Sequence, residues 1–310
     1  MLLEILFLVI TLTSTAQSEW LIIGRTTGEL SFNGKDTIRC FGFSNSLSGQ
    51  ITLPGAMIEA AEGDSVLIDF WNISQGAPHA LSIMNLEILQ KNNKGHYEIE
   101  KKEIHHMDHG FYKFHAKEAG THIYYSSRNT SFSLQAGMFG LVIIQPKTPK
   151  KINCPEVVWC SNEIDSTWHS NYLLDYENEF RSAKPQYPKY KPQYYLINGQ
   201  EINQNQGLEL DPSIDTNQVI LRLANTGTFS NLITFPRNVT ISHLSGDPQV
   251  ITKDKNGTHV HLETLETVDV LVQTDAFSEN TTVLYRYVDS NTGKTKHKVK
   301  LPLFTQSLNQ

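Results

Sequence analysis

The chain has 310 residues, of which 39% are hydrophobic, and this is enough material for two ordinary globular domains. The formal net charge of −6 leaves no basic face of the kind that binds nucleic acid, so we expect no nucleic-acid partner. Beyond the first residues no apolar segment is long enough for a membrane-spanning helix, so we expect no integral membrane segment.

A short apolar run opens the chain at residues 5–12, ILFLVITL, and the small residues Ser14, Thr15 and Ala16 follow it. The run is too short to span a bilayer and has the layout of a secretory signal peptide that is cleaved after Ala16. Residues 1–16 are therefore predicted to be a signal peptide, and the protein to be secreted, or periplasmic in a bacterium. The alternative is an uncleaved first strand.

Short alternating or apolar runs follow one another through the first half of the chain, separated by clusters of Gly, Asn, Pro or Asp. Such runs predict β-strands, and their close spacing favours an antiparallel sandwich or barrel. We assign a first all-β domain to residues 19–146, with strands at Trp20–Ile23, Thr37–Phe43, Ser65–Trp71, His79–Ile83, Phe111–His115, His122–Tyr125 and Phe139–Ile144.

A charged, proline-bearing stretch at residues 146–151, PKTPKK, has the composition of a linker. Beyond it we assign a second all-β domain to residues 154–305. Within this domain residues 184–195, KPQYPKYKPQYY, are predicted to be an exposed extended loop, with a peptide-docking segment as the alternative. The predicted strands are Val157–Cys160, Tyr194–Ile197, Val219–Leu223, Leu232–Phe235, Val239–His243, Gln249–Thr252, His259–Leu262, Val268–Val272, Thr282–Tyr287 and Lys296–Val299.

A dense group of imidazoles precedes one predicted strand, at His105, His106 and His109. Histidines so close on a loop are candidate ligands for Cu(II) or Zn(II), and Met107 among them suits Cu(I). The alternative is a solvated polar loop. His259 and His261 alternate and so share one strand face, where they are either two metal ligands or a polar surface pair.

The cysteines are Cys40, Cys154 and Cys160. In an oxidising compartment we expect Cys154 and Cys160 to pair across a short loop and Cys40 to stay free. Acceptor sites for N-glycosylation, which are compatible with a glycoprotein, occur at Asn72, Asn129, Asn238, Asn256 and Asn280.

Residues 118–144, KEAGTHIYYSSRNTSFSLQAGMFGLVI, have the frame of a copper-ligand loop. Gly120-Thr121, the pair Tyr124-Tyr125, the Gly137–Gly140 turn and a last apolar strand fit the order found in plastocyanin-like (cupredoxin) domains. The segment from Leu53 to Asn72 resembles the PG-x-x-I-x-A-x-x-GD-x-V opening of multicopper oxidases and copper nitrite reductases. The stretches 195–199, 219–227, 250–254 and 265–272 resemble the second domain of multicopper oxidases.

The resemblance to the multicopper oxidase superfamily implies two tandem cupredoxin-like Greek-key β-sandwich domains and names copper as the candidate cofactor. Under a plastocyanin-like alignment, His79 and Met138 hold the first-histidine and axial-methionine positions. Ser126 then stands where the cysteine ligand belongs, and Asn129 lies near the place of the second histidine. Under an oxidase-like alignment, Tyr125 and Ser127 replace the His-x-His pair of a trinuclear cluster.

A blue copper site depends on a soft cysteine thiolate, which a serine hydroxyl cannot replace. We therefore predict a secreted, copper-deficient and non-catalytic relative of the multicopper oxidases that serves as a binding or interaction scaffold for a protein partner. One alternative is a copper oxidoreductase whose ligands are completed by homo-oligomerisation. Another is an extracellular copper carrier that uses the His105–His109 loop. In this interpretation the candidate metal ligands are His79, Met138, His105, His106 and His109.

Overall fold

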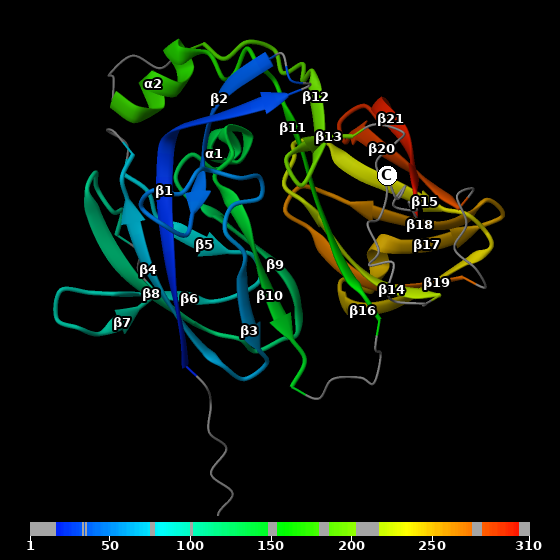
Figure 1. The fold of residues 1–310 in the computed structure, drawn as a ribbon, viewed down its shortest axis with the longest axis horizontal. Helices are drawn as coiled ribbons and strands as arrows, with labels where there is room; N and C mark the ends of the chain where they lie inside the picture. The colour runs from blue at the N-terminus through cyan, green and yellow to red at the C-terminus, as the bar shows by residue number, and fades with distance from the viewer. Residues whose placement is uncertain are drawn as a thin grey trace, which may run out of the picture.

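The computed structural model describes residues 17–32, 34, 36–74, 78–99, 102–147, 154–179, 186–202, 217–274 and 281–303. These residues form two β-sandwiches that lie side by side, the first from β1 to β10 and the second from β11 to β21 (Figure 1). The predicted all-β fold with cupredoxin-like tandem domains is confirmed. The predicted signal peptide and most of the predicted linker lie outside the described residues.

The first sandwich packs a six-stranded sheet against a four-stranded sheet. In the first sheet, β1 runs parallel to β4, while β4 and β8 are antiparallel. Along β4, Val66, Ile68 and Phe70 point into the core and alternate with partly exposed side chains, as a half-buried strand requires. The strand order of the six-stranded sheet is β2 (Asp36–Ser44), β1 (Gln17–Phe32), β4 (Ser65–Asn72), β8 (Asp108–His115), β6 (Ile88–Lys91) and β7 (Tyr97–Glu98). The strand order of the four-stranded sheet is β3 (Ile58–Ala61), β10 (Phe139–Gln145), β9 (Gly120–Ser126) and β5 (Leu81–Ile83).

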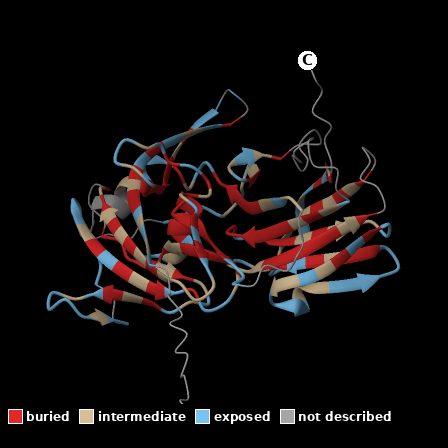
Figure 2. Cartoon of the chain, turned by 60° about the horizontal axis from the view of Figure 1, so that its bottom comes forward, coloured by how far each residue is buried: buried red, intermediate tan, exposed pale blue. Residues whose placement is uncertain are grey.

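The second sandwich packs a six-stranded sheet against a five-stranded sheet around a core that includes Leu221, Val260 and Tyr285. Figure 2 shows the buried residues of both sandwiches concentrated between their sheets. The strand order of the six-stranded sheet is β13 (Gln200–Glu201), β12 (Tyr194–Ile197), β11 (Glu156–Ile164), β14 (Gln218–Asn225), β19 (Thr267–Thr274) and β16 (Val239–Gly246). The strand order of the five-stranded sheet is β17 (Ile251–Asp254), β18 (Gly257–Leu262), β15 (Ser230–Phe235), β20 (Thr282–Asp289) and β21 (Lys294–Pro302).

Two predicted strands begin later than expected. β5 starts at Leu81, because His79 instead forms an isolated bridge with Ile104. Before β17, the chain makes a 3-10 turn at Pro248–Val250, since the Asp247 side chain caps the turn by accepting from the Gln249 N–H. The described helices are short, α1 (Thr130–Ala136) and α2 (Asn171–Glu179), and none in the described part of the chain is long and apolar enough to cross a membrane.

The segment between β11 and β12 crosses back from the second sandwich onto the first. Leu173 and Leu174 of α2 are buried in the hydrophobic core of the first sandwich. Asp175 of the same helix pairs with Arg39 of β2 at 2.6 Å. In Figure 1, α2 accordingly lies beside the first sandwich, and one buried cluster includes residues from both sandwiches, such as Phe139 and Cys160.

A second contact between the sandwiches is polar and buried. Arg222 of β14 donates to Asp269 of β19 across 2.6 Å, and both residues are at most 4% exposed. The Thr121 hydroxyl of the first sandwich also donates to Asp269, at 2.7 Å. Asp269 is thereby held by donors from both sandwiches, and this fixes their relative position.

Candidate metal centre

The loop that resembles a copper-ligand loop joins β9 to β10 through the short helix α1. Asn129 takes a left-handed conformation with φ 41° at the start of α1, and Gly137 with φ 111° ends it. The Gly137 N–H donates to the carbonyls of Ser133 and Leu134, which is the usual way to terminate a helix with glycine. The Ser126 N–H donates to the Met138 carbonyl at 3.2 Å, so the two ends of the loop are tied together.

His79 and Ser126 are brought together in the interior of the first sandwich. His79 is held by two backbone hydrogen bonds with Ile104, of 3.0 and 2.7 Å. Its Nδ1 lies 3.0 Å from the Ser126 Oγ, and the two residues are 3% and 0% exposed. The structure thus pairs the two positions that the plastocyanin-like alignment treats as ligands.

Burial keeps the His79 imidazole neutral. Desolvation, with a smaller contribution from the Arg128 charge, lowers the pKa of His79 to about 3. Its Nε2 is buried and has no hydrogen-bond partner among the described residues. A neutral imidazole can serve as a metal ligand, but here its Nδ1 is already engaged by a hydroxyl.

The other ligand positions do not supply the missing donors. Met138 is fully buried within the hydrophobic core, and Asn129 is exposed at the start of α1. On the oxidase-like alignment, the Ser127 hydroxyl donates to the Ala80 carbonyl at 3.3 Å and Tyr125 is half-buried. One imidazole, one thioether and hydroxyl groups do not fit a blue copper or a trinuclear copper centre, because the thiolate and the further imidazoles are absent from these positions.

The histidines of the His105–His109 loop point to separate partners. His106 Nδ1 contacts the Ser74 carbonyl. His109 Nδ1 lies 2.9 Å from Asp69 Oδ1, and the His109 ring packs at a tilt of 33° against Trp71 with ring centroids 4.4 Å apart. His105 is exposed. Among the described residues no three His, Cys, Asp or Glu side chains gather closely enough to hold a metal ion.

Sequence analysis missed a polar chain that links the sandwiches. Glu163 of β11 is 1% exposed, and its Oε1 accepts from the N–H groups of Thr228 and Phe229. The Tyr190 hydroxyl lies 3.0 Å from that oxygen and 2.6 Å from Gln135 Oε1 of α1. Burial raises the pKa of Glu163 to about 7. The only sequence signal was the tyrosine-rich composition of the segment that contains Tyr190.

His169 continues this chain on the side of the first sandwich. Its Nε2 lies 2.9 Å from the Gln135 carbonyl, and its Nδ1 lies 2.7 Å from the Arg39 carbonyl. The Cys40 sulfur is 3.7 Å from the same Nδ1, while burial raises the pKa of the Cys40 thiol to about 12. The thiol therefore stays protonated, and this contact has no thiolate character.

The predicted Cys154–Cys160 disulfide is wrong, because all three cysteines are free. Cys160 lies within the extended strand β11, which begins at Glu156, so the four residue steps from Glu156 to Cys160 alone extend over roughly 13 Å. A disulfide needs Cα atoms about 4.4–6.8 Å apart. The short separation in sequence is therefore a long separation in space.

The predicted glycosylation sites differ in their access to solvent. Asn72 is 0% exposed, and its amide donates to the Ile104 carbonyl at 2.8 Å. Asn129, Asn238 and Asn256 are exposed. Asn280 lies outside the described residues. A glycan on Asn72 is incompatible with the folded first sandwich, so this site is corrected to a structural asparagine.

Comparison with known proteins agrees with the fold and the loop. Residues 45–149 match the family model of the multicopper oxidases. No curated protein matches the chain in sequence. Among solved structures, a blue copper oxidase from Nitrosomonas europaea matches with a TM-score of 0.63 and 19% identity over 92% of this chain and 86% of that one. A copper nitrite reductase from the same organism has a TM-score of 0.61 and 14% identity, with 95% of each chain covered.

Fet3p, described as a multicopper oxidase that functions in iron import, matches with a TM-score of 0.64 and 18% identity. The match covers 96% of this chain but only 54% of Fet3p. These similarities define a protein of two tandem cupredoxin-like domains. The family match itself covers the first domain, where residues 45–149 resemble the multicopper oxidases.

Proposed function

We propose that the protein is a secreted, copper-deficient member of the multicopper oxidase superfamily that acts as a binding or interaction scaffold. The observation that supports this most is the buried pair of His79 and Ser126, whose side chains lie 3.0 Å apart where the family has a histidine and a cysteine ligand. In this proposal the sandwich pair is retained as a rigid frame, while the copper chemistry is lost.

We infer the loss of copper chemistry from the chemistry of the side chain at residue 126, the position of the metal-binding cysteine in the family. A type 1 copper is held chiefly by a thiolate, a soft anionic ligand that also tunes its potential. The Ser126 hydroxyl is hard and remains protonated near neutral pH, and it is fully buried against the neutral His79 imidazole. The Nδ1 of His79 is thereby engaged by a hydroxyl, and the pair lacks the thiolate and the second imidazole of a type 1 copper site.

Copper loading tests this function directly. The purified secreted protein would be incubated with Cu(II), desalted, and analysed for bound copper, visible absorption, and oxygen consumption with a phenol and with Fe(II). We expect no intense blue band and no turnover above that of free copper. A strong thiolate-to-copper band or clear turnover would instead support the oxidoreductase, with ligands completed by a second copy of the chain.

A copper carrier is the second candidate, and the exposure of one loop favours it. Met107 is 64% exposed, and His105 and His106 beside it are exposed as well. Calorimetric copper titration of the triple variant H105A/H106A/H109A tests this candidate, with H79A as the matched control. Loss of most binding in the triple variant alone supports a carrier, and loss in H79A alone moves the site into the core.

Export is a separate part of the proposal. The apolar run at residues 5–12, followed by small residues up to Ala16, is its basis. N-terminal sequencing of the protein from its native source should find Gln17 as the first residue. Retention of Met1 on a protein inside the cell would contradict this proposal and would leave the fold untouched.

A further inference from the structure

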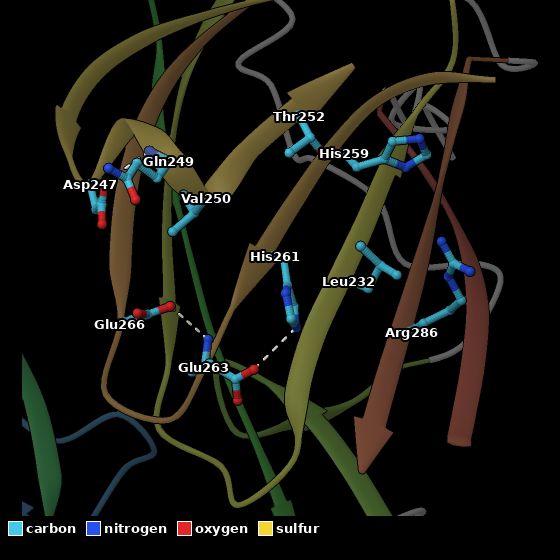
Figure 3. A pocket seen from close by; sticks show the side chains of 10 residues that line it. All are labelled: Leu232, Asp247, Gln249, Val250, Thr252, His259, His261, Glu263, Glu266 and Arg286. Carbon is cyan, nitrogen blue, oxygen red and sulfur yellow. Dashed lines mark hydrogen bonds and ion pairs between the residues drawn. The ribbon is translucent and has the colours of Figure 1, made fainter. Parts of the chain in front are cut away.

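The outer face of the five-stranded sheet in the second sandwich is acidic at one side. A hollow of about 540 Å³ lies there, and its lining includes the carboxylates of Asp247, Glu263 and Glu266. Figure 3 shows Asp247 and Glu266 on one side of the hollow and Arg286 on the other. Arg286 is the one lysine or arginine among the described residues that line it. Because three negative side chains face one positive side chain, the hollow suits a further cationic group.

Within the described part of the chain, none of these three carboxylates forms an ion pair with a lysine or an arginine. Asp247 and Glu266 each accept a hydrogen bond from a backbone N–H at 2.8 Å. Glu263 accepts from the Ser290 hydroxyl at 2.7 Å and lies 3.3 Å from His261 Nε2. The negative charge of the hollow is therefore available to a lysine or arginine from outside the chain.

Lysines gather at the opposite edge of the same face, on β21. Lys298 is the register partner of Arg286, and Lys300 is the register partner of Leu284. These side chains point outward, since Tyr285, between Leu284 and Arg286 on β20, lies in the core. Both lysines are exposed, and neither has an ion pair among the described residues. This edge of the face is therefore basic.

A continuous row of paired residues shows how far apart the two edges are. The row consists of Lys300 on β21, Leu284 on β20, Thr234 on β15, His259 on β18 and Thr252 on β17. Neighbouring strands are about 4.8 Å apart, so β21 lies roughly 14 Å from β18 and roughly 19 Å from β17. The lysines of β21 therefore cannot reach the carboxylates beside β17 and β18 of the same chain. Lys253 of β17 does not reach them either, because it alternates with Thr252 and so faces away from the hollow.

The middle of this face is uncharged. Leu232 and Thr234 of the central strand β15 point outward, because Ile233 between them is fully buried in the core. Leu284 of β20 pairs with Thr234 and also points outward. All three outward side chains are half-buried. A small, partly apolar centre thus lies between a basic and an acidic side, and neither charge is repeated at the centre.

We propose that a second copy of this chain docks on this face, with β21 of each copy over the acidic side of the hollow of the other. β15 is the middle strand of the five, so a two-fold axis along it exchanges β21 with β17 and β20 with β18. Lys298 and Lys300 of one copy then lie near the carboxylates of the second copy, and the two Leu232 side chains meet at the axis. A two-fold homodimer uses the same patch on both copies, so each charge contact forms twice.

The charges favour a second copy over other occupants, because both halves of the match are present on one chain. Lysines on an edge strand also prevent sheets from pairing edge to edge, but that role does not explain the carboxylates at the other side of the same face. The face has five strands of 4–9 residues, so it covers roughly 500 Å² on each copy, or about 1,000 Å² in total. This area is near the lower limit of specific interfaces, so we expect a weak dimer.

Sedimentation equilibrium of the mature chain tests this proposal at about 50 mM and about 500 mM salt, because salt screens contacts between exposed charges. The protein is used without glycans, since the acceptor Asn256 lies in the turn between β17 and β18, at the border of the face. The first variant is K298E/K300E. Its matched control is K94E/K117E, which makes the same change of charge at two exposed lysines of the first sandwich. Circular dichroism and thermal unfolding of each variant separate loss of the dimer from loss of fold.

A charge swap makes the test specific for this pairing. The variant D247K/E263K reverses the acidic side of the hollow, and it is measured alone and in an equal mixture with K298E/K300E. In a dimer of the two different variants, both contacts again join opposite charges. The mixture should therefore recover the dimer that each variant alone has lost.

We expect the wild type to dimerise at low salt and to dissociate at high salt. K298E/K300E and D247K/E263K should each raise the dissociation constant about tenfold or more, and K94E/K117E should change it less than about threefold. Three results would overturn the proposal: a monomer at every concentration up to about 1 mM, equal losses in K298E/K300E and its control, or a mixture of the swapped variants that stays monomeric. A monomeric wild type would leave this face to a partner other than a second copy. If D247K/E263K does not fold, the comparison of K298E/K300E with its control at both salt concentrations decides.

Discussion

The Tyr190 hydroxyl lies 3.0 Å from Glu163 Oε1 and 2.6 Å from Gln135 Oε1, so one side chain connects a buried carboxyl of the second sandwich to helix α1 of the first. Gln135 in turn contacts His169 through its carbonyl, at 2.9 Å. Residues 186–189 before it are exposed and have no regular secondary structure, yet the tyrosine side chain reaches into the interface between the sandwiches.

Replacing Tyr190 with phenylalanine should lower the free energy of unfolding by about 1–2 kcal/mol, because a buried oxygen loses the donor that the single hydroxyl proton supplies while the ring packing is kept. Urea unfolding measures this loss. Y172F is the matched control, since Tyr172 is 61% exposed. Equal stability of Y190F and Y172F would show that the hydroxyl makes no net contribution.

Glu163 should make the stability of the protein depend on pH. Its pKa is raised from 4.5 to about 7, mainly by burial, so the folded state holds a proton that the unfolded state has already released. Stability from this group is complete below about pH 4.5, falls as pH rises to about 7, and changes by about 3 kcal/mol in total.

The E163Q variant isolates this effect, because the amide keeps an acceptor for the Thr228 and Phe229 N–H groups but does not titrate. Unfolding free energies of wild type and E163Q are compared at pH 5 and pH 8. The wild type should lose stability relative to E163Q at the higher pH. A difference that does not change between the two pH values would place the Glu163 pKa near its ordinary range.

The buried Asp269, which accepts hydrogen bonds from both sandwiches, should matter more than the exposed ion pair. D269A leaves Arg222 Nη1 and the Thr121 hydroxyl without their shared acceptor, while Arg222 keeps its ion pair with Glu156, so we expect a loss of about 1–3 kcal/mol. D175A removes the partly exposed pair with Arg39, so we expect a loss of at most about 1 kcal/mol. Denaturant unfolding of both variants gives the comparison, and similar losses would contradict it.

Residue patterns predicted the strands well, because apolar and polar residues alternate at neighbouring positions along a half-buried strand. The pattern Val66, Ile68, Phe70 and the apolar run of β10 are examples. The plastocyanin-like alignment also assigned His79 and Ser126 to two ligand positions, and their side chains lie 3.0 Å apart. The strand pattern is carried by neighbouring residues, whereas this assignment depended on the resemblance to a family.

Contacts between distant segments could not be read in the same way. Nothing local indicates that Leu173 and Leu174 belong to the core of the first sandwich, since that packing depends on residues far away in the chain. Closeness in sequence was also misleading. Cys154 and Cys160 are held apart by an extended strand, and His106 and His109 contact different partners.

Asn72 should remain unmodified in the folded protein, even when other acceptor asparagines carry glycans. Its amide donates to the Ile104 carbonyl in the interior, and a sugar on that nitrogen would have to displace the surrounding core. Peptide mass mapping of the protein from a glycosylating host measures occupancy at each site. Glycans found on Asn238 or Asn256 but not on Asn72 would agree with the structure, whereas an occupied Asn72 in folded protein would contradict it.

Restoring the cysteine alone should not restore a blue copper centre. In S126C a thiol would replace the hydroxyl that lies 3.0 Å from His79 Nδ1, so one thiolate and one imidazole would be available beside the buried Met138. A type 1 site also needs a second imidazole. The candidate position for it, Asn129, is exposed at the start of α1, while His79 and residue 126 are buried. We therefore expect copper-loaded S126C to lack an intense thiolate-to-copper band.

The double variant S126C/N129H and the thiol-free S126A are the matched comparisons for this test. S126A sets the background of copper binding without a thiol, and visible spectra of all three after copper loading and desalting give the readout. At most a weak band is expected from the double variant, because a histidine at residue 129 begins at the surface and its approach to the buried pair would require the start of α1 to move. An intense band from S126C alone would show that folding or assembly supplies a further imidazole. It would favour a copper oxidoreductase over a copper-deficient scaffold as the function of this protein.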